Sequence, residues 1–230
     1  MSVLDPEDVG AIILSLKVAG TSMAIGLPIA LGVAYALARG RFPGRALLDA
    51  LTHLPLVLPP VATGFALLVL FGPRGPLGRA LEVVGITVAF RWTGAALAAG
   101  IMAFPLMVRP IRLSIEAIDR EVDEAARTLG AGPLVRFFRI TTPLAAPGLI
   151  AGAVLGFAKA LGEFGATITF VGAIPGETLT LPTAIYQATQ VPGAEDQALV
   201  LCAIAAVIAI AAVLVSDLVS RRLTRGREQG

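Results

Sequence analysis

Five long apolar segments constrain the fold of this chain more than any other feature of its sequence. Most of them reach the roughly 20 residues that a helix needs to cross the hydrocarbon core of a bilayer. They are apolar nearly all round, whereas the helices of a soluble domain keep a polar face. The segments are Ala11–Ala38, Leu51–Phe71, Thr93–Val108, Gly148–Val171 and Ala198–Val219. We expect an all-α integral membrane protein with a single domain over residues 1–230. The expected number of transmembrane helices is about five, with six as the alternative.

The arginines are divided unequally between the connections of these segments. Thirteen follow the first, third and fifth segments, and three follow the second. The connection Ala173–Gln197, after the fourth segment, has no basic residue and is expected to contain one short helix. Cytoplasmic flanks of transmembrane helices are enriched in Arg and Lys. The pattern predicts that the N-terminus lies outside the cell and the C-terminus in the cytoplasm.

The composition excludes several function classes. Cys202 is the only cysteine and His53 the only histidine, which argues against a disulfide and against a metal site built from these residues. The formal net charge of +2 gives no sign of a nucleic-acid partner. The two lysines, Lys17 and Lys159, lie outside any phosphate-binding Gly-x-x-x-x-Gly-Lys sequence. We expect no catalytic residue, no cofactor and no metal on this chain, so any ATPase that drives it is a separate protein.

Residues 111–147 form a charged region between the third and fourth apolar segments. Apolar residues recur at steps of three and four from Ile115 to Leu129, the period of a helix. Gly130 follows, where glycine can take a positive φ and end a helix. A second helical run, Leu134–Ile140, is expected to end before Pro143. The pattern predicts two short helices joined by a glycine turn on the cytoplasmic face; a solvated connecting loop is the simpler alternative.

Part of this region matches a known motif in residue type and spacing. The matching residues are Glu124-Ala125-Ala126, Gly130, Ile140 and Pro143. In these residues the chain resembles the EAA-motif inner-membrane permeases of bacterial ABC importers, with Thr142 in place of a leucine. The resemblance implies a type I ABC importer permease core whose coupling-helix region, residues 111–147, seats in an ATPase subunit. Gly130 would form the turn, and Glu124 a polar contact at that seat.

The same resemblance implies the partners and the location of the chain. The permease would form a homodimer in the bacterial cytoplasmic membrane, crossing it several times. Two ABC ATPase subunits, which use ATP-Mg, and an extracytoplasmic binding protein would complete the transporter.

Three polar residues, Lys159, Glu163 and Thr167, lie four residues apart in the fourth apolar segment. On one helix they would share a face, and Lys159 could pair with Glu163. Ionisable groups at membrane depth usually line a pathway or pair with one another. Two alternatives follow, namely a gate or lining of an anion pathway and a structural ion pair that fixes helix packing.

Proline-rich sequence opens the second apolar segment. Pro55, Pro59 and Pro60 predict that its first turns are kinked or irregular. Irregular backbone at membrane depth is tolerated where it faces protein or a water-filled cavity. A helix lining a pathway and a distorted helix end near the surface are both consistent with this pattern.

Several stretches narrow the resemblance to the molybdate permease family. They are His53–Pro60, Phe104–Arg109, Ala160–Thr167 and Ile174–Tyr186. Sulfate and thiosulfate permeases usually have Tyr-Gly-Ser where this chain has Phe164-Gly165-Ala166. The resemblance implies import of molybdate, with tungstate as companion substrate, and a molybdate-binding protein as partner. The alternatives are a sulfate or thiosulfate permease and, in a different class, an ion-coupled secondary anion transporter with Lys159 and Glu163 as its relay.

Overall fold

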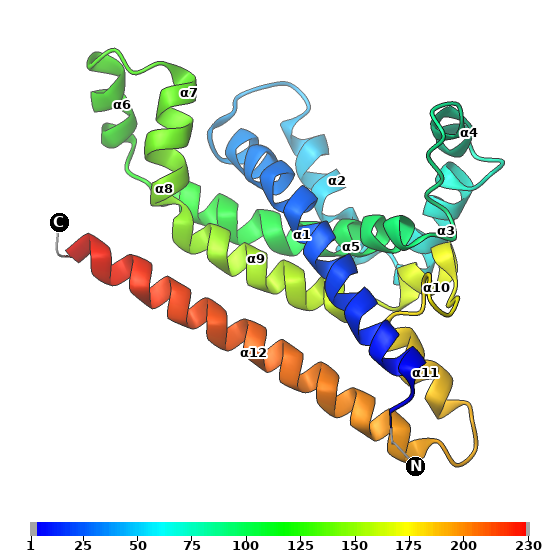
Figure 1. Ribbon diagram of the computed structural model, residues 1–230. Helices are drawn as coiled ribbons and strands as arrows, with labels where there is room; N and C mark the ends of the chain where they lie inside the picture. Colours follow the sequence, from blue (N-terminus) through cyan, green and yellow to red (C-terminus); the bar gives the residue numbers. More distant parts are fainter. Residues whose placement is uncertain (1–3, 229–230) are drawn as a thin grey trace.

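The computed structural model describes the backbone of residues 4–228 and the side chains of residues 4–215. Over this range the chain forms only helices and their connections, which confirms the all-α expectation (Figure 1). The helices are α1 (Pro6–Arg39), α2 (Arg45–Val57), α3 (Pro60–Phe71), α4 (Pro76–Glu82), α5 (Trp92–Glu116), α6 (Arg120–Thr128), α7 (Pro133–Arg136), a π-helix (Phe137–Thr141), α8 (Thr142–Leu144), α9 (Ala146–Leu161), α10 (Gly165–Val171), α11 (Leu181–Thr189) and α12 (Glu195–Glu228).

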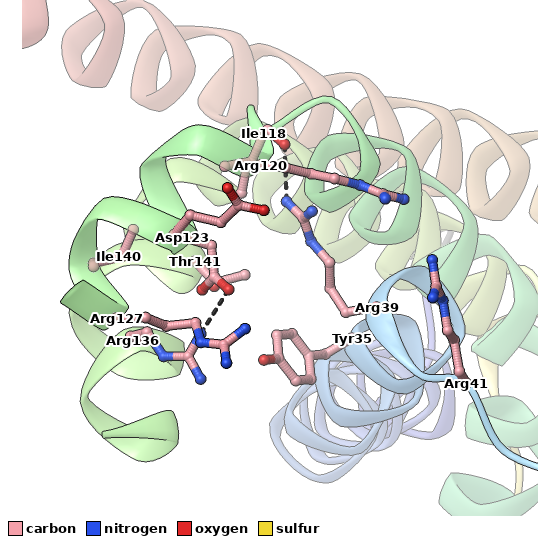
Figure 2. A pocket seen from close by; sticks show the side chains of 11 residues that line it. Tyr35, Arg39, Arg41, Ile118, Arg120, Asp123, Arg127, Arg136, Ile140 and Thr141 are labelled. Atoms are coloured by element: carbon pink, nitrogen blue, oxygen red, sulfur yellow. Dashed lines mark hydrogen bonds and ion pairs between the residues drawn. The ribbon is translucent and has the colours of Figure 1, made fainter. Parts of the chain in front are cut away.

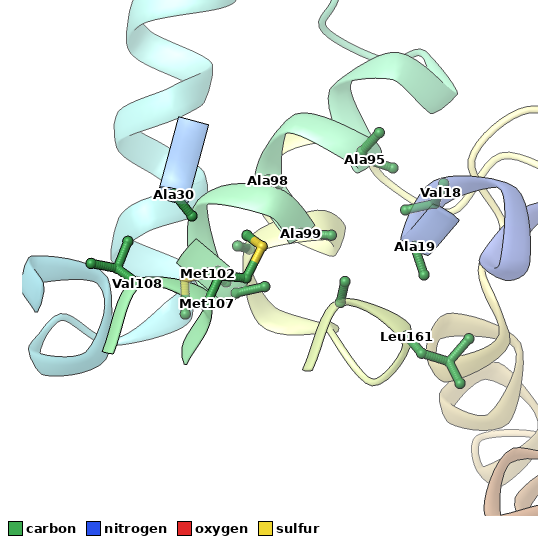
Figure 3. Close-up of a cluster of buried hydrophobic side chains, with 14 of the residues drawn as sticks. Val18, Ala19, Ala30, Ala95, Ala98, Ala99, Met102, Met107, Val108 and Leu161 are labelled. Atoms are coloured by element: carbon green, nitrogen blue, oxygen red, sulfur yellow. The ribbon is translucent and has the colours of Figure 1, made fainter. Parts of the chain in front are cut away.

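Helix α5 is the centre of the fold and packs extensively against both α1 and α9, which also contact each other. Its buried residues are mostly small, including Ala95, Ala98 and Ala99, with Met102 and Met107 filling the remaining space (Figure 3). Small side chains let helix backbones approach closely, which is the main source of packing contact between helices in a membrane.

The contact between α5 and α9 depends on three glycines of α9 spaced four residues apart. A Cβ atom on Gly148 would lie 2.5 Å from the carbonyl oxygen of Pro110, and one on Gly152 would lie 2.8 Å from that of Met107. A Cβ atom on Gly156 would lie 2.6 Å from the Met107 side chain. The backbone of α9 therefore reaches α5 at distances that only glycine permits.

Among the described residues, three helices, α1, α5 and α12, are long and apolar enough to cross a membrane. Two bent pairs of helices, α2 with α3 at 115° and Pro133–Leu144 with α9 at 70°, raise the number to five if each pair is one span. The count of about five is consistent with this range, and the orientation of the crossings stays a prediction.

The second apolar segment, Leu51–Phe71, is not one helix with an irregular start. Helix α2 ends at Val57, where the N–H of Leu58 donates to the carbonyl of Leu54, and α3 starts again at Pro60. Pro59 and Pro60 have no N–H to continue the helical hydrogen bonds, so the irregular backbone predicted from the prolines lies at Leu58–Pro59, whereas Pro55 stays within α2.

The predicted boundaries of the third and fourth segments also change. The third segment extends well beyond Thr93–Val108 because α5 runs through Pro105 and Pro110 as far as Glu116. The fourth, Gly148–Val171, is interrupted where α9 ends at Leu161, and α10 starts only at Gly165.

The basic connections gather at one end of the molecule. The C-terminal ends of α1, α5 and α12 lie there with α6–α8, whereas α4, α10 and α11 lie at the other end (Figure 1). The arginines that follow the first and third apolar segments thus share one end, as the charge pattern predicts. The basic residues of the fifth flank, Arg221, Arg222, Arg225 and Arg227, lie outside the residues whose side chains are described.

We predict that Gly152→Ala lowers the thermal unfolding midpoint of the purified permease. The added methyl group would press on the α5 backbone, and overpacking of this kind costs about 1–3 kcal/mol. Gly100→Ala is the matched control on α5, because its Cβ would lie an ordinary 3.6 Å from Ser22. Equal unfolding midpoints for the two variants would show that α9 does not approach α5 as described.

Candidate functional site

The charged region between α5 and α9 starts with a helix break at Ala117–Asp119. Asp119 caps α6, and its Oδ1 accepts a hydrogen bond from the N–H of Glu121 at 3.0 Å. The apolar stripe from Ile115 to Leu129 is therefore not one helix face, and that prediction is wrong. Ile115 is fully buried at the end of α5, whereas Leu129 lies after α6 with 87% of its surface exposed.

Gly130 forms the turn after α6 with φ at +81°, which confirms the predicted glycine turn. Its N–H donates to the carbonyl of Arg127, and the next N–H, of Ala131, donates to the carbonyl of Ala126. A Cβ on Gly130 would meet no atom within 4 Å. The requirement for glycine therefore comes from the left-handed backbone and not from lack of space.

The second helical run is longer than Leu134–Ile140. It continues as α7, the π-helix and α8 from Pro133 to Leu144, so Pro143 lies inside it and does not end it. The wider π turn explains the difference, since the backbone N–H of Thr142 donates to the carbonyl of Phe137, five residues earlier, and its hydroxyl donates to the same oxygen. Within a π-helix the hydrogen-bond register shifts by one residue, which helps to accommodate a missing proline N–H.

Two contacts hold these short helices together and to the rest of the protein. Arg136 on α7 pairs with Asp123 on α6 at 2.6 Å. Phe137 packs edge-on against Tyr35 of α1, with ring centroids 4.9 Å apart. We refer to α6, the Gly130 turn and α7–α8 together as the coupling unit.

The outer surface of the coupling unit combines charged and exposed apolar residues. The large exposed apolar side chains from α6 to the π-helix are Val122, Leu129, Leu134, Val135 and Phe138, and we call this set the tip surface. Of the motif residues, Glu124, Ala125, Gly130 and Pro143 are exposed, Ile140 is half-buried and Ala126 is buried. Apolar side chains gathered on an exposed projection mark a surface that meets another protein.

Residues that the sequence did not single out support the base of the coupling unit. Arg39, at the end of α1, donates to the carbonyls of Ile115 and Ile118 at 3.2 and 2.8 Å. Arg112 pairs with Glu116 on its own helix at 2.8 Å and with Asp49 of α2 at 2.9 Å. The sequence alone could have indicated the Arg112–Glu116 pair, because residues four apart on a helix are neighbours. The role of Arg39 has no such signal, because its acceptors are backbone atoms on a distant segment.

The second predicted cluster lies at the break between α9 and α10. Lys159 and Glu163 form the predicted ion pair, with Nζ 2.6 Å from Oε2. Glu163 is not on a helix, however, so the shared face with Thr167 is wrong. Its Oε1 accepts the N–H of Ala166 at 2.9 Å, and the carboxylate therefore caps α10 while it pairs with Lys159.

The three residues of this cluster differ in how much of each side chain is exposed. The side chain of Glu163 is 1% exposed and that of Lys159 is 30% exposed. Thr167 is buried, and its hydroxyl donates to the backbone carbonyls of Glu163 and Phe164. Lys159 is therefore the exposed member of the pair, and the choice between a pathway lining and a structural ion pair stays a prediction.

The two helix breaks meet next to this cluster. A Cβ on Gly165 would lie 2.7 Å from Cβ of Pro60, and one on Gly64 would lie 2.5 Å from the carbonyl oxygen of Ala166. On the same turn of α3, the hydroxyl of Thr63 is buried without a hydrogen-bond partner among the described residues. The interrupted backbone thus faces protein, one of the two surroundings in which it is tolerated at membrane depth.

Comparison with known proteins gives consistent results over most of the chain. Residues 26–229 match the family model described as binding-protein-dependent transport system inner membrane component. The molybdenum transport system permease protein ModB of Escherichia coli K12 is 53% identical over 222 residues, 96% of each chain. ModB of Haemophilus influenzae is 50% identical, covering 97% of this chain and 98% of that one. The sulfate transport system permease protein CysW of Synechococcus elongatus is 38% identical, covering 77% and 62%.

Solved structures match the fold at low sequence identity. A bacterial ABC transporter involved in the import of the acidic polysaccharide alginate has a TM-score of 0.78 at 21% identity, covering 96% of this chain and 81% of that one. The MetNI methionine ABC transporter has a TM-score of 0.68 at 16% identity, covering 94% of each chain.

We predict that Lys159→Met destabilises the protein more than the double variant Lys159→Met/Glu163→Gln. The single change leaves a buried carboxylate without its cation, which costs about 3–5 kcal/mol. The double variant removes the charge but keeps an oxygen for the N–H of Ala166. Thermal unfolding of the purified variants measures the difference, and a double variant that is no more stable than Lys159→Met would contradict a tightly coupled buried pair.

Proposed function

Because this chain belongs to the family of binding-protein-dependent transport system inner membrane components, we propose that it is the permease subunit of an ATP-driven molybdate importer. Tungstate, the heavier tetrahedral oxyanion of the same group, is the companion substrate. Two relatives named as molybdenum permeases are 50–53% identical over nearly the whole chain, against 38% for the one named as a sulfate permease. This difference favours molybdate over sulfate and thiosulfate.

The coupling unit is the observation that carries the mechanism. It projects from the end of the molecule where the basic connections gather, and its tip surface exposes apolar side chains to a partner. In the proposal a separate ABC ATPase seats this surface, with Glu124 as a polar contact and Gly130 as the turn. The nucleotide, ATP-Mg, is bound by the ATPase and not by this chain.

The contacts at the base of the coupling unit explain how a push on it would reach the membrane. Arg39 connects α1 to the end of α5, and Tyr35 connects α1 to the π-helix. The run from Pro133 to Leu144 joins α9 through a 70° bend. Movement of the coupling unit would therefore displace α1, α5 and α9 together, as alternating access requires.

The full transporter in this proposal contains two copies of the permease, two ATPase subunits and an extracytoplasmic molybdate-binding protein. The binding protein selects the anion, so this chain needs only a pathway that accepts a divalent oxyanion. Lys159, whose side chain is partly exposed, is the residue of the pair that could meet the anion. The pair is equally suited to holding α9 and α10 in place.

We predict that Gly130→Pro lowers ATP-driven molybdate uptake at least about tenfold, the effect of losing roughly 1.4 kcal/mol in coupling. Proline fixes φ near −65°, whereas Gly130 has φ at +81° and donates its N–H to Arg127. Gly132→Pro is the matched control, because Gly132 already has φ at −65° with extended ψ. Both variants should reach the membrane in normal amounts. Uptake by Gly130→Pro at the wild-type rate would remove the coupling role from this turn.

We also predict that uptake of radiolabelled molybdate into proteoliposomes needs the ATPase, ATP and the binding protein, and survives collapse of the proton gradient. An excess of sulfate should leave most of the uptake in place. Strong competition by sulfate would favour the sulfate permease alternative. Uptake without ATP that stops on addition of a protonophore would instead identify a secondary transporter.

A further inference from the structure

A cavity of about 330 Å³ lies between the end of α1 and the inner side of the coupling unit. Its lining comes from three separate parts of the chain, and Figure 2 shows Arg127 and Arg136 on one side of Tyr35 and Arg41 and Arg120 on the other. The basic residues that line it are Arg39, Arg41, Arg120, Arg127 and Arg136. Neither the apolar segments nor the EAA motif predicts such a cluster, because it forms only when α1 meets α6 and α7.

The charges in this cavity do not balance. Five guanidinium groups meet only two carboxylates, Asp123 and Glu124, so the lining has a formal excess of three positive charges. Arg136 pairs with Asp123, and Arg39 donates to two neutral backbone carbonyls. The guanidinium groups of the other three arginines make no hydrogen bond or ion pair with any residue that the structure describes.

Arg136 adds a second, independent observation. Its Nε is buried and has no hydrogen-bond partner among the residues of known placement, although its Nη1 is paired with Asp123. A buried N–H without an acceptor is rare in folded proteins, because its desolvation is not repaid. Arg136 thus lines the cavity and also carries an unsatisfied donor inside the coupling unit beside it.

We propose that this cavity binds a tetrahedral oxyanion of the phosphate class. Guanidinium groups form paired, charge-assisted hydrogen bonds with such oxygens, and several can surround one tetrahedral group. The hydroxyls of Tyr35 and Thr141 on the same lining provide further donors. The oxyanion is either a free cytoplasmic anion or the phosphodiester of an anionic phospholipid, since α1 leaves the apolar region next to the cavity.

An anion in this position would connect two parts of the protein. Arg41 follows α1, whereas Arg127 belongs to the coupling unit, and one anion between them would link the unit to the helix against which it moves. This role is independent of which anion the membrane pathway carries. The binding test below therefore succeeds or fails separately from the molybdate uptake experiment.

Binding of radiolabelled inorganic phosphate to the delipidated full-length permease in detergent tests the proposal. We expect saturable binding by the wild type that weakens about tenfold in Arg127→Gln and in Arg41→Gln, the effect of losing one charge-assisted contact. Arg127→Lys, which keeps the charge but loses the paired geometry, should weaken binding less. Size-exclusion chromatography checks that each variant remains folded.

Arg139→Gln is the matched control, because Arg139 is an exposed arginine of the same connection that does not line the cavity. It removes the same charge and should bind phosphate like the wild type. Any phosphate that binds in the membrane pathway adds equally to every variant. The difference between Arg127→Gln and Arg139→Gln, and not the total bound, therefore reports on the cavity. Equal affinities for these two variants, or no saturable binding by the wild type, would overturn the proposal.

Nanodiscs distinguish the two sources of the oxyanion. The labelled phosphate bound in nanodiscs that contain phosphatidylglycerol is compared with that bound in nanodiscs of phosphatidylcholine alone. If phosphatidylglycerol displaces phosphate from the wild type but not the residual phosphate bound by Arg127→Gln, the occupant is a lipid headgroup. If labelled phosphate binds equally in both lipids, the occupant is a free anion. Both results support an oxyanion site that depends on Arg127.

Discussion

The close packing of α9 against α5 is the contact on which the rest of this structure depends. Gly148, Gly152 and Gly156 bring the two backbones together, and the connection between the two helices is the coupling unit. In a membrane there is little hydrophobic gain from bringing helices together, so packing of small residues provides much of the attraction. Any loosening at these glycines would therefore also change the position of the surface that a soluble partner meets.

Interrupted helices are the second organising feature, and they occur where the protein encloses them. The break at Pro59 in the second apolar segment packs against the break after Leu161 in the fourth, through Pro60 and Gly165. The free backbone groups at the second break are partly satisfied by Glu163, which caps α10 and pairs with Lys159. A buried charge of this kind is costly unless it is paired, so the pair and the break explain each other.

The end of the molecule that bears the coupling unit combines two kinds of surface. Outward, the tip surface is apolar and suits a protein partner. Inward, the cavity beside α1 is strongly basic and suits an oxyanion. Arg136 connects the two, because it fixes α7 to α6 through Asp123 and also lines the cavity. A change at Arg136 would therefore disturb the proposed docking and the proposed anion binding together. A change at Arg127 would affect anion binding alone, and a change at Gly130 would affect docking alone.

The sequence by itself determined the features that depend on local pattern. Apolar length predicted the membrane segments, the position of Gly130 predicted a turn with positive φ, and the four-residue spacing of Lys159 and Glu163 predicted their pairing. Each of these depends on residues that are close in the chain, so the short backbone between them limits their separation; Glu163 stays within reach of Lys159 although α9 ends at Leu161.

Only the tertiary structure decided where these segments break and what lies beside them. The apolar stripe after Ile111 divides at Asp119, because Ile115 finds a place in the core and Leu129 does not. Arg39 donates to carbonyls 76 and 79 residues away, and the basic cavity joins α1 to α6 and α7. Helix ends need partners for their backbone groups, and any part of the fold can supply them. Sequence patterns do not record which part does, so these contacts emerge only when distant segments are packed together.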